Sequence, residues 1–481
     1  MNEIDKTIIE KLASRVAELG GRAYMVGGAV RDEIMKRPIK DVDIEVHGIS
    51  GAILETVLKE LGKPLRFGSA FGVYSLAGHQ MDIALPRSER KAGNGHRDFE
   101  IEIDPFIGIK EAARRRDFTM NALLKDILSG EIADPYGGTE DIKNRIIRHI
   151  DDRKFGEDPL RALRAAQFRS RFGFQVAPST ISICRALDLR NLSAERVEME
   201  MKKALLESRR PSEFFECLRE MGQLGYWFKE LEQLIGLEQN PEFHPEGDVW
   251  THTMMVLDRA AQFRPYASDP YAFMLLALTH DFGKITTTEF VNGAIHAYGH
   301  EIQGAEIAER FLDRVCHGSD IKKYIANMIP NHMRPNKIAE SRSAVKKTNH
   351  LFDSVLAPSD LIYFAICDKP KLPYVLQSQD KDSIKVEMDK GIEKDLYTTT
   401  ENEREQERID FLFDRLEVYR EMMAKPYVTG KDLIINGVTP GEDFGTILEY
   451  AHKLRLAGIP KDNALRQTIS YAIKLRKNNK R

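Results

Sequence analysis

The chain has 481 residues, of which 42% are apolar and 30% are charged, and 71 Lys and Arg stand against 74 Asp and Glu. This composition is typical of folded domains with sizeable cores, and it argues against collagen-like, coiled-coil and wholly disordered chains. No apolar run comes near the roughly 20 residues that a membrane span needs, and the start has no basic flank or cleavage site of a signal peptide. We therefore expect no membrane contact and a cytoplasmic location.

The net charge of -3 hides two basic stretches. Residues 143–171 hold nine Lys and Arg against four acids, and residues 453–481 hold nine against one, so local contacts with nucleic acid stay open. The cysteines lie far apart without a C-x-x-C pair, which argues against a thiolate zinc site or disulfides. We expect all four to be reduced and mostly buried: Cys184, Cys217, Cys316 and Cys367.

Residues 1 to about 150 alternate helical and strand patterns. Helical spacing covers residues 8–19 and 51–61, and Gly20 and Gly21 end the first of these helices. Short strand patterns lie between turn residues at 23–26, 42–46, 73–76, 81–85 and 99–103. After Pro159 helical spacing dominates, and a charged amphipathic helix is predicted over 401–421.

Two glycines and a pair of aspartates follow the first predicted strand. In the run GGAVRD at positions 27–32 the glycines let backbone N–H groups approach a phosphate, and Arg31 is able to hold the same anion. Strand alternation places Asp41 and Asp43 on one face, where two carboxylates repel each other unless a cation joins them. Oxygen ligands favour Mg²⁺, and Asp82 on a later strand would complete a two-metal site for displacement at phosphorus.

This order of motifs resembles the nucleotidyltransferase superfamily, whose signature is a G-G or G-S turn followed by D-x-D. The fuller string VGGAVRDEIM...KDVDIE is similar to the class II branch, which comprises the tRNA nucleotidyltransferases (CCA-adding enzymes) and the bacterial poly(A) polymerases. The resemblance implies a polymerase-beta-like head in which Asp41, Asp43 and Asp82 are catalytic and Gly28 and Arg31 bind the nucleotide.

An arginine run forms the next matching motif. RRRDFTMNAL at positions 114–123 is similar to the family's R-R-D-F-T-x-N-A-L motif, and DPYGG at 134–138 resembles its D-P-x-G-G loop. Guanidinium groups bind a triphosphate by bidentate contacts that Lys cannot make. We expect Arg116 to bind phosphate and Asp117 to accept a ribose hydroxyl.

A carboxylate and a guanidinium lie three residues apart at Asp158 and Arg161, which would share a helix face. Such a pair is able to imitate the pairing edge of a base. The position resembles the family's E-D-x-x-R motif, which selects C and then A, and implies that Asp158, Arg161 and Arg164 bind the nucleotide. Many relatives continue R-A-A-R-F where this chain has Gln167, which supplies no cationic contact to phosphate.

Eight of the thirteen histidines lie between positions 244 and 350, which marks a second functional unit. We place His252 before a helix and the pair His280-Asp281 on a buried helix, where both polar groups are costly to bury unless something bonds them. A metal ion would do so. The predicted ligands are His252, His280, Asp281 and Asp368.

These residues resemble the H...HD...D pattern of the HD phosphohydrolase superfamily. His300 and His332 match extra histidines of many members and are expected to serve a second metal or a phosphate. Imidazole and carboxylate ligands suit Ni²⁺, Mn²⁺, Zn²⁺ or Fe²⁺. The resemblance implies a phosphodiesterase or phosphatase that uses metal-activated water on 2',3'-cyclic or 2'-phosphate RNA ends.

Together the motifs predict an α+β protein in which a mixed sheet with helices forms the nucleotidyltransferase head and the neck, HD body and tail are all helical. GKDL at 430–433 and FGTIL at 444–448 resemble the tail of class II CCA-adding enzymes, and the basic stretch after them suits RNA phosphates. We expect a head at 1–150, a base-selecting neck at 151–235, an HD phosphohydrolase domain at 236–400 and a tRNA-binding tail at 401–481.

The predicted function is addition of C, C and A to tRNA 3' ends from CTP and ATP, with Mg²⁺ at Asp41 and Asp43. A poly(A) polymerase and an A-only or CC-only enzyme carry the same motifs. The polar segment 87–99 resembles the flexible loop of full CCA enzymes and favours A addition. Other hypotheses are an HD hydrolase with a nucleotide-sensing head, an alarmone synthetase-hydrolase, which has the HD part first, and a non-catalytic tRNA-binding protein.

Overall fold

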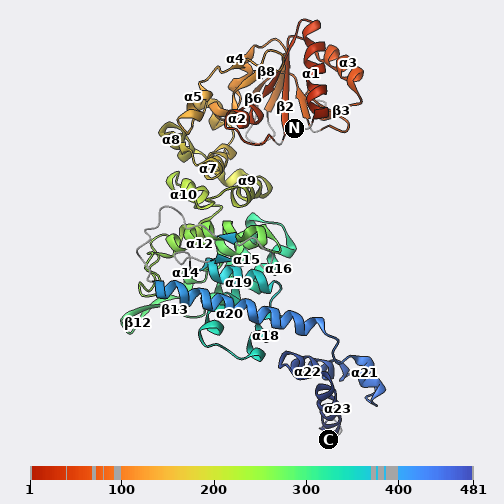
Figure 1. The fold of residues 1–481 in the computed structure, drawn as a ribbon. Helices are drawn as coiled ribbons and strands as arrows, with labels where there is room; N and C mark the ends of the chain where they lie inside the picture. Colours follow the sequence, from red (N-terminus) through yellow and green to blue (C-terminus); the bar gives the residue numbers. More distant parts are fainter. Residues whose placement is uncertain are drawn as a thin grey trace. The chain divides into compact units, whose positions relative to one another are not determined.

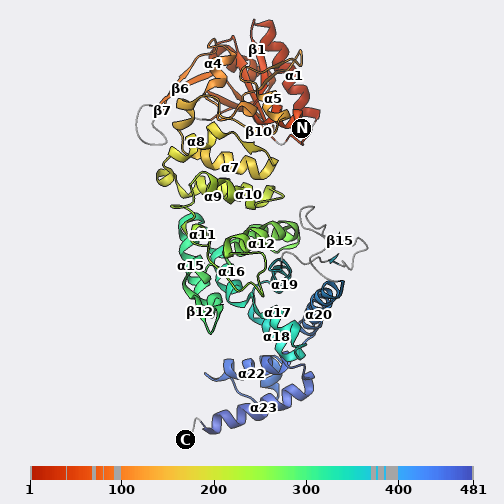
Figure 2. The ribbon, with the colours of Figure 1, turned by 90° about the vertical axis from the view of Figure 1, so that its left-hand side faces the viewer.

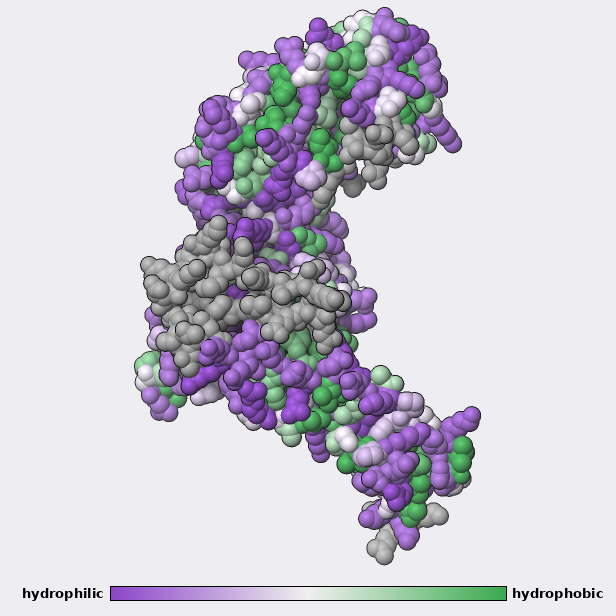
Figure 3. All heavy atoms as spheres, in the orientation of Figure 1, coloured by the Kyte–Doolittle hydropathy of each residue, from purple (hydrophilic) through white to green (hydrophobic). Residues whose placement is uncertain are grey.

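The computed structural model describes residues 3–39, 41–67, 72–79, 81–91, 99–369, 375–376, 384–385 and 399–478. It divides into two compact units, residues 1–229 and 230–481, and each is described by itself. The face drawn in Figure 3 is mostly hydrophilic with small scattered hydrophobic areas, as the charged fraction of 30% implies. Part of the predicted loop at 87–99, residues 92–98, lies outside the described residues.

The first unit begins with a mixed seven-stranded sheet in the order β3-β4-β5-β2-β1-β8-β9 (Figure 1). Strands β2 and β5 run parallel, and the other neighbours are antiparallel. The strands are β1 (Arg22–Val26), β2 (Val42–His47), β3 (Pro64–Phe67), β4 (Val73–Leu76), β5 (Met81–Ala84), β8 (Leu124–Asp126) and β9 (Ile132–Ala133). A separate pair joins β6 (Arg87–Lys91) to β7 (Phe99–Ile103).

Helices α1 (Glu3–Glu18) and α3 (Gly51–Leu61) lie on one face of this sheet (Figure 1). Their apolar stripes supply Leu12, Val16, Leu54 and Leu58, which form one buried cluster with alternate residues of the strands. The predicted helices and strands of the head are therefore confirmed. Shorter helices complete the head: α2 (Gly28–Ile34), α4 (Ile109–Arg114) and α5 (Gly138–Lys143).

Helices dominate the remainder of the first unit (Figure 2). Helix α7 (Leu160–Phe172) buries an apolar face and ends at Gly173, which adopts a left-handed conformation. A two-residue parallel pairing joins β10 (Ile146–Ile147) to β11 (Gln175–Val176). The other helices are α6 (Asp152–Gly156), α8 (Pro178–Ala186), α9 (Ala194–Glu207) and α10 (Ser212–Glu220), and α11 (Lys229–Glu232) begins where this unit ends.

The second unit is built mainly of helices, as predicted. The helices are α12 (Val249–Phe263), α13 (Pro270–Thr279), α14 (Lys284–Thr287), α15 (His300–Val315), α16 (Ser319–Met328), α17 (Arg334–Glu340), α18 (Val345–Ser354), α19 (Pro358–Cys367), α20 (Thr399–Ala424), α21 (Gly430–Ile435), α22 (Phe444–Leu456) and α23 (Lys461–Asn478). Helix α20 contains the predicted amphipathic segment, and its stripe residues Ile409, Leu412 and Leu416 are buried.

The expectation of an all-helical chain after Pro159 misses a β-hairpin in the second unit. Strands β12 (Thr288–Val291) and β13 (Ala294–Ala297) pair antiparallel around Asn292 and Gly293, which both have positive φ. Asn-Gly is the preferred dipeptide of such two-residue turns, so the sequence did carry the signal. A short antiparallel pairing of two residues on each side also joins β14 (Val375–Leu376) to β15 (Ile384–Lys385).

The four cysteines are free and buried, as expected. Among the described residues, no single helix has the length and apolar character to cross a membrane. One pair, Val345–Ser354 with Pro358–Cys367, meets that criterion only when taken together, by length and composition, and it is bent by 100°.

Candidate active sites

The predicted carboxylates lie on neighbouring strands of the first unit. Asp43 on β2 is paired in register with Asp82 on β5, and Asp41 directly precedes β2. All three side chains are exposed at the surface of the sheet. Partial loss of water contact raises the pKa of Asp43, Arg116 opposes this, and Asp82 and Asp41 raise it further. Three carboxylates that repel one another in this way favour a bound cation.

Asp41 and Asp43 line a cleft of about 950 Å³, here called the head cleft. Its other lining residues come from the glycine turn, the arginine run and helices α7 and α9. They include every predicted nucleotide-binding residue: Gly28, Arg31, Arg116, Asp117, Asp158, Arg161 and Arg164. Asp82 is not among the residues that line this cleft.

Arg116 lies directly against the glycine turn. A Cβ atom on Gly27 would stand 2.5 Å from Nη1 of Arg116, and Gly27 has a φ of 68°, so the turn accepts only glycine. The buried Glu45 holds the guanidinium of Arg115 at 3.4 Å, that of Arg116 at 4.0 Å and His47 at 2.9 Å. Burial works against ionisation, but His47 and the two arginines lower the pKa of Glu45 to about 2.

Arg31 is buried with its guanidinium fixed on both sides. Its Nη1 donates to Asn121 Oδ1 at 2.6 Å and its Nε to Asp32 at 2.8 Å. The guanidinium carbon lies 4.8 Å from the centre of the Phe172 ring, a cation–π distance. Arg31 is therefore preorganised toward the cleft.

The carboxylate of Asp117 is already engaged within the protein. It accepts from Arg164 Nε at 2.7 Å, from Asn121 Nδ2 at 2.9 Å and from the N–H of Phe118 at 2.8 Å. The pKa of Asp117 is lowered, because Arg164 and Asn121 outweigh the effect of burial. The geometry supports a role in orienting Arg164, and the predicted ribose contact stays a prediction.

Asp158 and Arg161 do not form the expected pair on one helix face, because helix α7 begins only at Leu160. Asp158 accepts from the N–H of Leu160 at 3.1 Å and from Arg196 Nη2 at 2.8 Å. The Nη atoms of Arg161 donate to the carbonyls of Lys154 at 2.8 Å and Arg115 at 2.7 Å. Both side chains line the head cleft, each fixed by a partner of its own.

Gln167, the departure from the family motif, is buried and lines the head cleft. With its amide oxygen turned toward Arg171, it accepts from Nη1 at 3.0 Å and from Nε at 3.3 Å. Arg171 lies one helical turn further on and lines the same cleft. A cation is therefore present beside the position that lacks the family arginine.

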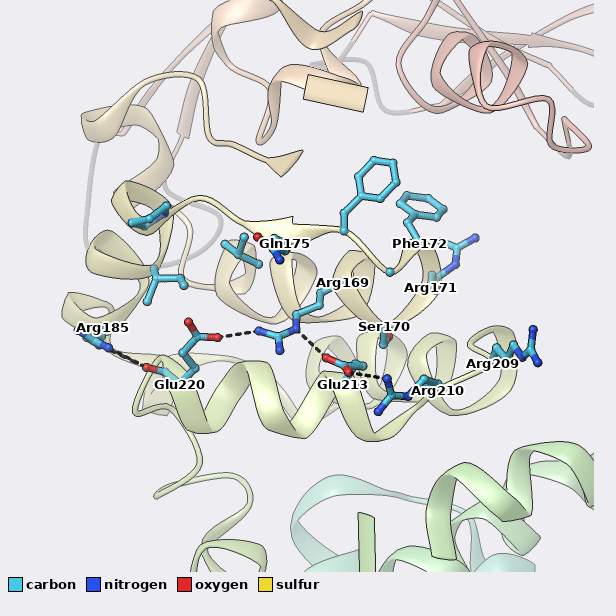
Figure 4. A pocket seen from close by; sticks show the side chains of 15 residues that line it. Arg169, Ser170, Arg171, Phe172, Gln175, Arg185, Arg209, Arg210, Glu213 and Glu220 are labelled. Atoms are coloured by element: carbon cyan, nitrogen blue, oxygen red, sulfur yellow. Dashed lines mark hydrogen bonds and ion pairs between the residues drawn. The ribbon is translucent and has the colours of Figure 1, made fainter. Parts of the chain in front are cut away.

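A separate pocket of about 1000 Å³ lies among the neck helices. In Figure 4, Arg169 lies between two acids, with its Nε 2.9 Å from Glu213 and its Nη1 2.6 Å from Glu220. Arg210 also contacts Glu213, at 3.4 Å, and Arg185 donates to the carbonyl of Glu220 at 3.1 Å. These contacts link α7, α8 and α10. The arginines that Figure 4 draws with partners therefore stabilise the packing of these three helices.

In the second unit, the four predicted metal ligands converge. His252 lies within α12, rather than before a helix, because Asp248 caps that helix earlier. His280 and Asp281 lie in the turn directly after α13, rather than on it, and Asp368 follows α19. Nε2 of His280 lies 3.4 Å from Nε2 of His252, 3.3 Å from Asp281 and 3.5 Å from Asp368.

The hydrogen bonds of the outer ring nitrogens fix the tautomers of these histidines. Nδ1 of His280 lies 3.0 Å from the carbonyl of Ala277, and Nδ1 of His252 lies 2.8 Å from Glu246. Both partners only accept, so Nδ1 carries a proton, and loss of any proton from Nε2, which metal binding brings about, leaves a neutral ring with the Nε2 lone pair pointing inward. Two lone pairs and two carboxylates then face one another, a donor set that fits a divalent cation.

A second group shares Asp281 with the first. Nε2 of His300 lies 3.5 Å from Asp281 and 3.4 Å from Nε2 of His332. The Nδ1 atoms of both rings face carbonyls, that of Ala297 at 2.8 Å and that of Ile329 at 2.7 Å. These three residues also have the spacing of metal ligands, so Asp281 lies where it can join two ions.

Burial and charge act in opposite directions at this centre. Burial alone would lower the pKa of His252, but hydrogen bonds with Asp368 and Glu246 raise it to about 9. Burial lowers the pKa of His332 to about 4, against the attraction of Asp368. Asp281 is buried as well, yet Lys284 at 2.7 Å and His280 keep its pKa well below the ordinary value.

Several supporting residues were not found by sequence reasoning. Arg196 lies 38 positions from Asp158, and Glu246 is joined to His252 only through the fold. No spacing of residues in the local sequence predicts either contact. The cluster of Glu45 with His47, Arg115 and Arg116 was not predicted either. The position of Glu45 on the same strand as Asp43 offered only a weak signal.

Comparisons with known proteins agree with this geometry. The model of the Poly A polymerase head domain matches residues 23–148, that of the probable RNA and SrmB- binding site of polymerase A matches 173–235, and the HD domain model matches 249–368. The multifunctional CCA protein of Actinobacillus pleuropneumoniae serotype 5b is 37% identical over 326 residues, 66% of this chain and 77% of the relative. The multifunctional CCA protein of Stenotrophomonas maltophilia is 37% identical over 356 residues, which are 72% of this chain and 84% of the relative.

Solved structures with the same fold are CCA-adding enzymes. The apo form II of a CCA-adding enzyme has a TM-score of 0.65 at 19% identity and covers 98% of this chain and 96% of its own. The Thermotoga maritima enzyme complexed with tRNA has a TM-score of 0.63 at 19% identity, with the same coverage. At this identity the likeness concerns the fold. Because the sequence identity extends over more than two thirds of these relatives, and the family models match both a polymerase head and an HD domain, the chain belongs to the family of the multifunctional CCA proteins, bacterial class II tRNA nucleotidyltransferases with an HD domain.

Proposed function

We propose that this enzyme adds C, C and A to the 3' ends of tRNA, with CTP and ATP as substrates. The observation that carries the proposal is the register pairing of Asp43 with Asp82, beside Asp41, at a cleft lined with arginines. The curated relatives are named multifunctional CCA proteins. A tRNA substrate would place the enzyme in the cytoplasm.

The reaction joins the 3' oxygen of the RNA to the α-phosphorus of the nucleotide, and the bond to pyrophosphate breaks. Asp41, Asp43 and Asp82 would hold Mg²⁺, which supplies activation of the attacking oxygen and charge neutralisation of the leaving group. Arg31 and Arg116 are fixed at the glycine turn, where they would bind the triphosphate. The backbone at Gly28 leaves room for the phosphate to approach.

Base selection is assigned to the start of α7. The carboxylate of Asp158 accepts hydrogen bonds and the guanidinium of Arg161 donates them, and each is held in place by hydrogen bonds within the protein. Fixed donors and acceptors discriminate between bases because a mismatched edge leaves buried polar groups unpaired. Arg164, oriented by Asp117, would add a further donor.

The experiment is nucleotide addition to a tRNA that ends at the discriminator base, with CTP, ATP, UTP or GTP supplied separately and then together. We expect two C residues from CTP alone and the complete CCA from CTP with ATP. An Asp43→Ala variant should lose addition, and Glu131→Ala, an exposed acid outside the cleft, should keep it.

The same assay separates the alternatives. Repeated A addition from ATP alone would identify a poly(A) polymerase. Addition that stops after two C residues, or that requires an existing CC end, would identify a partial enzyme. Retained activity in Asp43→Ala and Asp41→Ala would refute the assignment of the head.

For the second unit we propose a metal-dependent phosphohydrolase. His252, His280, Asp281 and Asp368 would hold one divalent ion, and Asp281, His300 and His332 would hold a second ion or the phosphate. Such an ion, Ni²⁺, Mn²⁺, Zn²⁺ or Fe²⁺, would supply water activation. Substrates would be 2',3'-cyclic or 2'-phosphate ends of RNA.

Elemental analysis of the purified enzyme, together with hydrolysis assays on 2',3'-cyclic AMP and 2'-AMP, tests this proposal. We expect bound metal and hydrolysis of at least one substrate. A wild-type enzyme that binds no metal and cleaves neither compound would refute it.

A further inference from the structure

Aromatic side chains stand exposed at the HD pocket, a cavity of about 350 Å³ beside the two histidine groups. Phe243 is 72% exposed and Tyr298 is 69% exposed, and both line this pocket. His296, from strand β13, stacks on Tyr298 with ring centroids 4.9 Å apart and planes inclined by 10°. Large aromatic surfaces left in water at a polar cavity indicate a ligand with a flat apolar face.

Each aromatic residue is joined to a different part of the histidine centre. Phe243 directly precedes His244, whose Nδ1 lies 3.0 Å from Glu246, the same carboxylate that holds His252. Tyr298 follows Ala297, whose carbonyl fixes His300 at 2.8 Å. The backbone at both aromatic residues is therefore tied to the histidine centre, and both side chains line the same pocket.

The hairpin β12–β13, which projects from the second unit (Figure 1), offers an internal comparison. Phe290 on β12 is 74% exposed, as much as the two pocket residues, but it does not line the pocket. Phe290 is therefore a control that tells whether exposure of an aromatic side chain on this hairpin is enough to affect ligand binding, or whether the side chain must line the pocket.

The remaining lining of the pocket suits one phosphate group. Lys284 is buried and contacts Asp281 at 2.7 Å and Gln239 at 3.0 Å, and the exposed Lys337 also lines the pocket. Ligand cavities start at about 300 Å³, so this one accepts a ligand of about one nucleotide.

We infer that Phe243 and Tyr298 form a stacking platform for the base of the nucleotide whose phosphate is hydrolysed. The inference rests on the proposed hydrolase function and adds that the pocket recognises a nucleoside phosphate through its base. Stacking accepts every base because each has a π-face, so the platform suits RNA ends of any sequence.

The test compares two phosphomonoesters of secondary alcohols, 2'-AMP with a base and β-glycerophosphate without one. In the metal-loaded full-length enzyme, Phe243→Ala and Tyr298→Ala should each raise KM for 2'-AMP about tenfold and leave kcat unchanged. Neither should change KM for β-glycerophosphate. Tyr298→Phe should behave as wild type, Phe290→Ala should have no effect, and Lys337→Ala should raise KM for both compounds.

A second readout does not depend on catalysis. Saturation-transfer NMR with adenosine and the metal-free enzyme should show a loss of transfer to the adenine protons in Phe243→Ala and Tyr298→Ala but not in Phe290→Ala. Binding of adenosine in the head contributes equally to all variants.

Equal losses for both phosphomonoesters, or an equal loss in Phe290→Ala, would overturn the platform. Unchanged KM and unchanged NMR transfer in both pocket variants would do the same. If the wild type hydrolyses neither phosphomonoester nor 2',3'-cyclic AMP, the hydrolase proposal fails by itself, and the NMR comparison still decides whether the aromatic residues bind a base.

Discussion

Asp158 illustrates how a distant partner fixes one functional side chain. Its Oδ2 accepts from Arg196 Nη2 at 2.8 Å, and Oδ1 accepts from the N–H of Leu160. Arg196 belongs to α9, so the orientation of the carboxylate depends on how α9 packs against α7. Hydrogen bonds to a charged group contribute roughly 1.5–3 kcal/mol.

Arg196→Ala should therefore weaken base selection, although Arg196 lies outside the E-D-x-x-R motif. We expect the preference for CTP and ATP over UTP to fall about tenfold, with a smaller change in the KM for the correct nucleotide. Asp158→Ala should give the same pattern more strongly. Single-nucleotide addition kinetics measure the preference for CTP and ATP over UTP, and Arg190→Ala, at an exposed arginine, is the control. An unchanged preference in Arg196→Ala would contradict a role of Arg196 in base selection.

The inward lone pairs of the histidines predict that added metal stabilises the fold. At a concentration 100 times its Kd, a ligand that binds only the folded state contributes about 2.7 kcal/mol. Mn²⁺ or Ni²⁺ should raise the Tm of the metal-free enzyme by several degrees. The rise should be lost in His280→Ala and kept in His317→Ala, which removes an exposed histidine of the same unit; an identical rise in both variants would place the bound metal elsewhere.

At the scale of elements, the centre depends on how tightly the turn after α13 approaches α15. A Cβ atom on Gly283 would lie 1.9 Å from the carbonyl oxygen of His300 and 2.7 Å from the N–H nitrogen of Gly304. Backbone atoms cannot move aside as a flexible side chain does. The position of His300 relative to Asp281 is thus set by a glycine three residues after His280.

Gly283→Ala should separate these elements and destabilise the second unit by about 1–3 kcal/mol or more. Metal affinity of the His300 group should fall with it. The matched control is Gly445→Ala in α22, where a Cβ meets nothing within 4 Å and helix propensity gains up to about 1 kcal/mol. Denaturant unfolding measures the stability of both variants, and metal titration measures their metal affinity. A Gly283→Ala enzyme as stable as the control would show that α15 can shift freely.

At the scale of the whole molecule, each proposed site lies within a single compact unit, the head cleft in residues 1–229 and the HD pocket in 230–481. Substitutions in one site remove no contact in the other. The two activities should therefore be separable.

Asp43→Ala should abolish nucleotide addition and leave phosphoester hydrolysis within about twofold of wild type, and Asp281→Ala should do the reverse. Addition to tRNA and hydrolysis of 2'-AMP, measured on the same preparations, decide it. Loss of both activities in either variant, with unchanged unfolding, would show that the sites are coupled.

Local spacing in the sequence predicted most elements of the head, and the motifs predicted the residues that gather at the head cleft and at the histidine centre. Alternation along a strand placed Asp41 and Asp43 together, and the glycine turn before Arg31 followed from backbone freedom, because both depend on neighbours within a few positions. Spacing failed at boundaries: Asp158 lies before α7, which begins after Pro159, and His252 lies inside α12, because Asp248 caps that helix.

Only the tertiary structure decided which partner holds each functional group. The carbonyls of Ala277, Ala297 and Ile329 fix three ring tautomers, and a carbonyl has no side-chain identity to read. Arg196 holds Asp158 across 38 positions, and Asp281 is shared by two histidine groups from separate segments of the chain. These contacts arise from the packing of distant segments, which depends on the whole core rather than on the residues near the site.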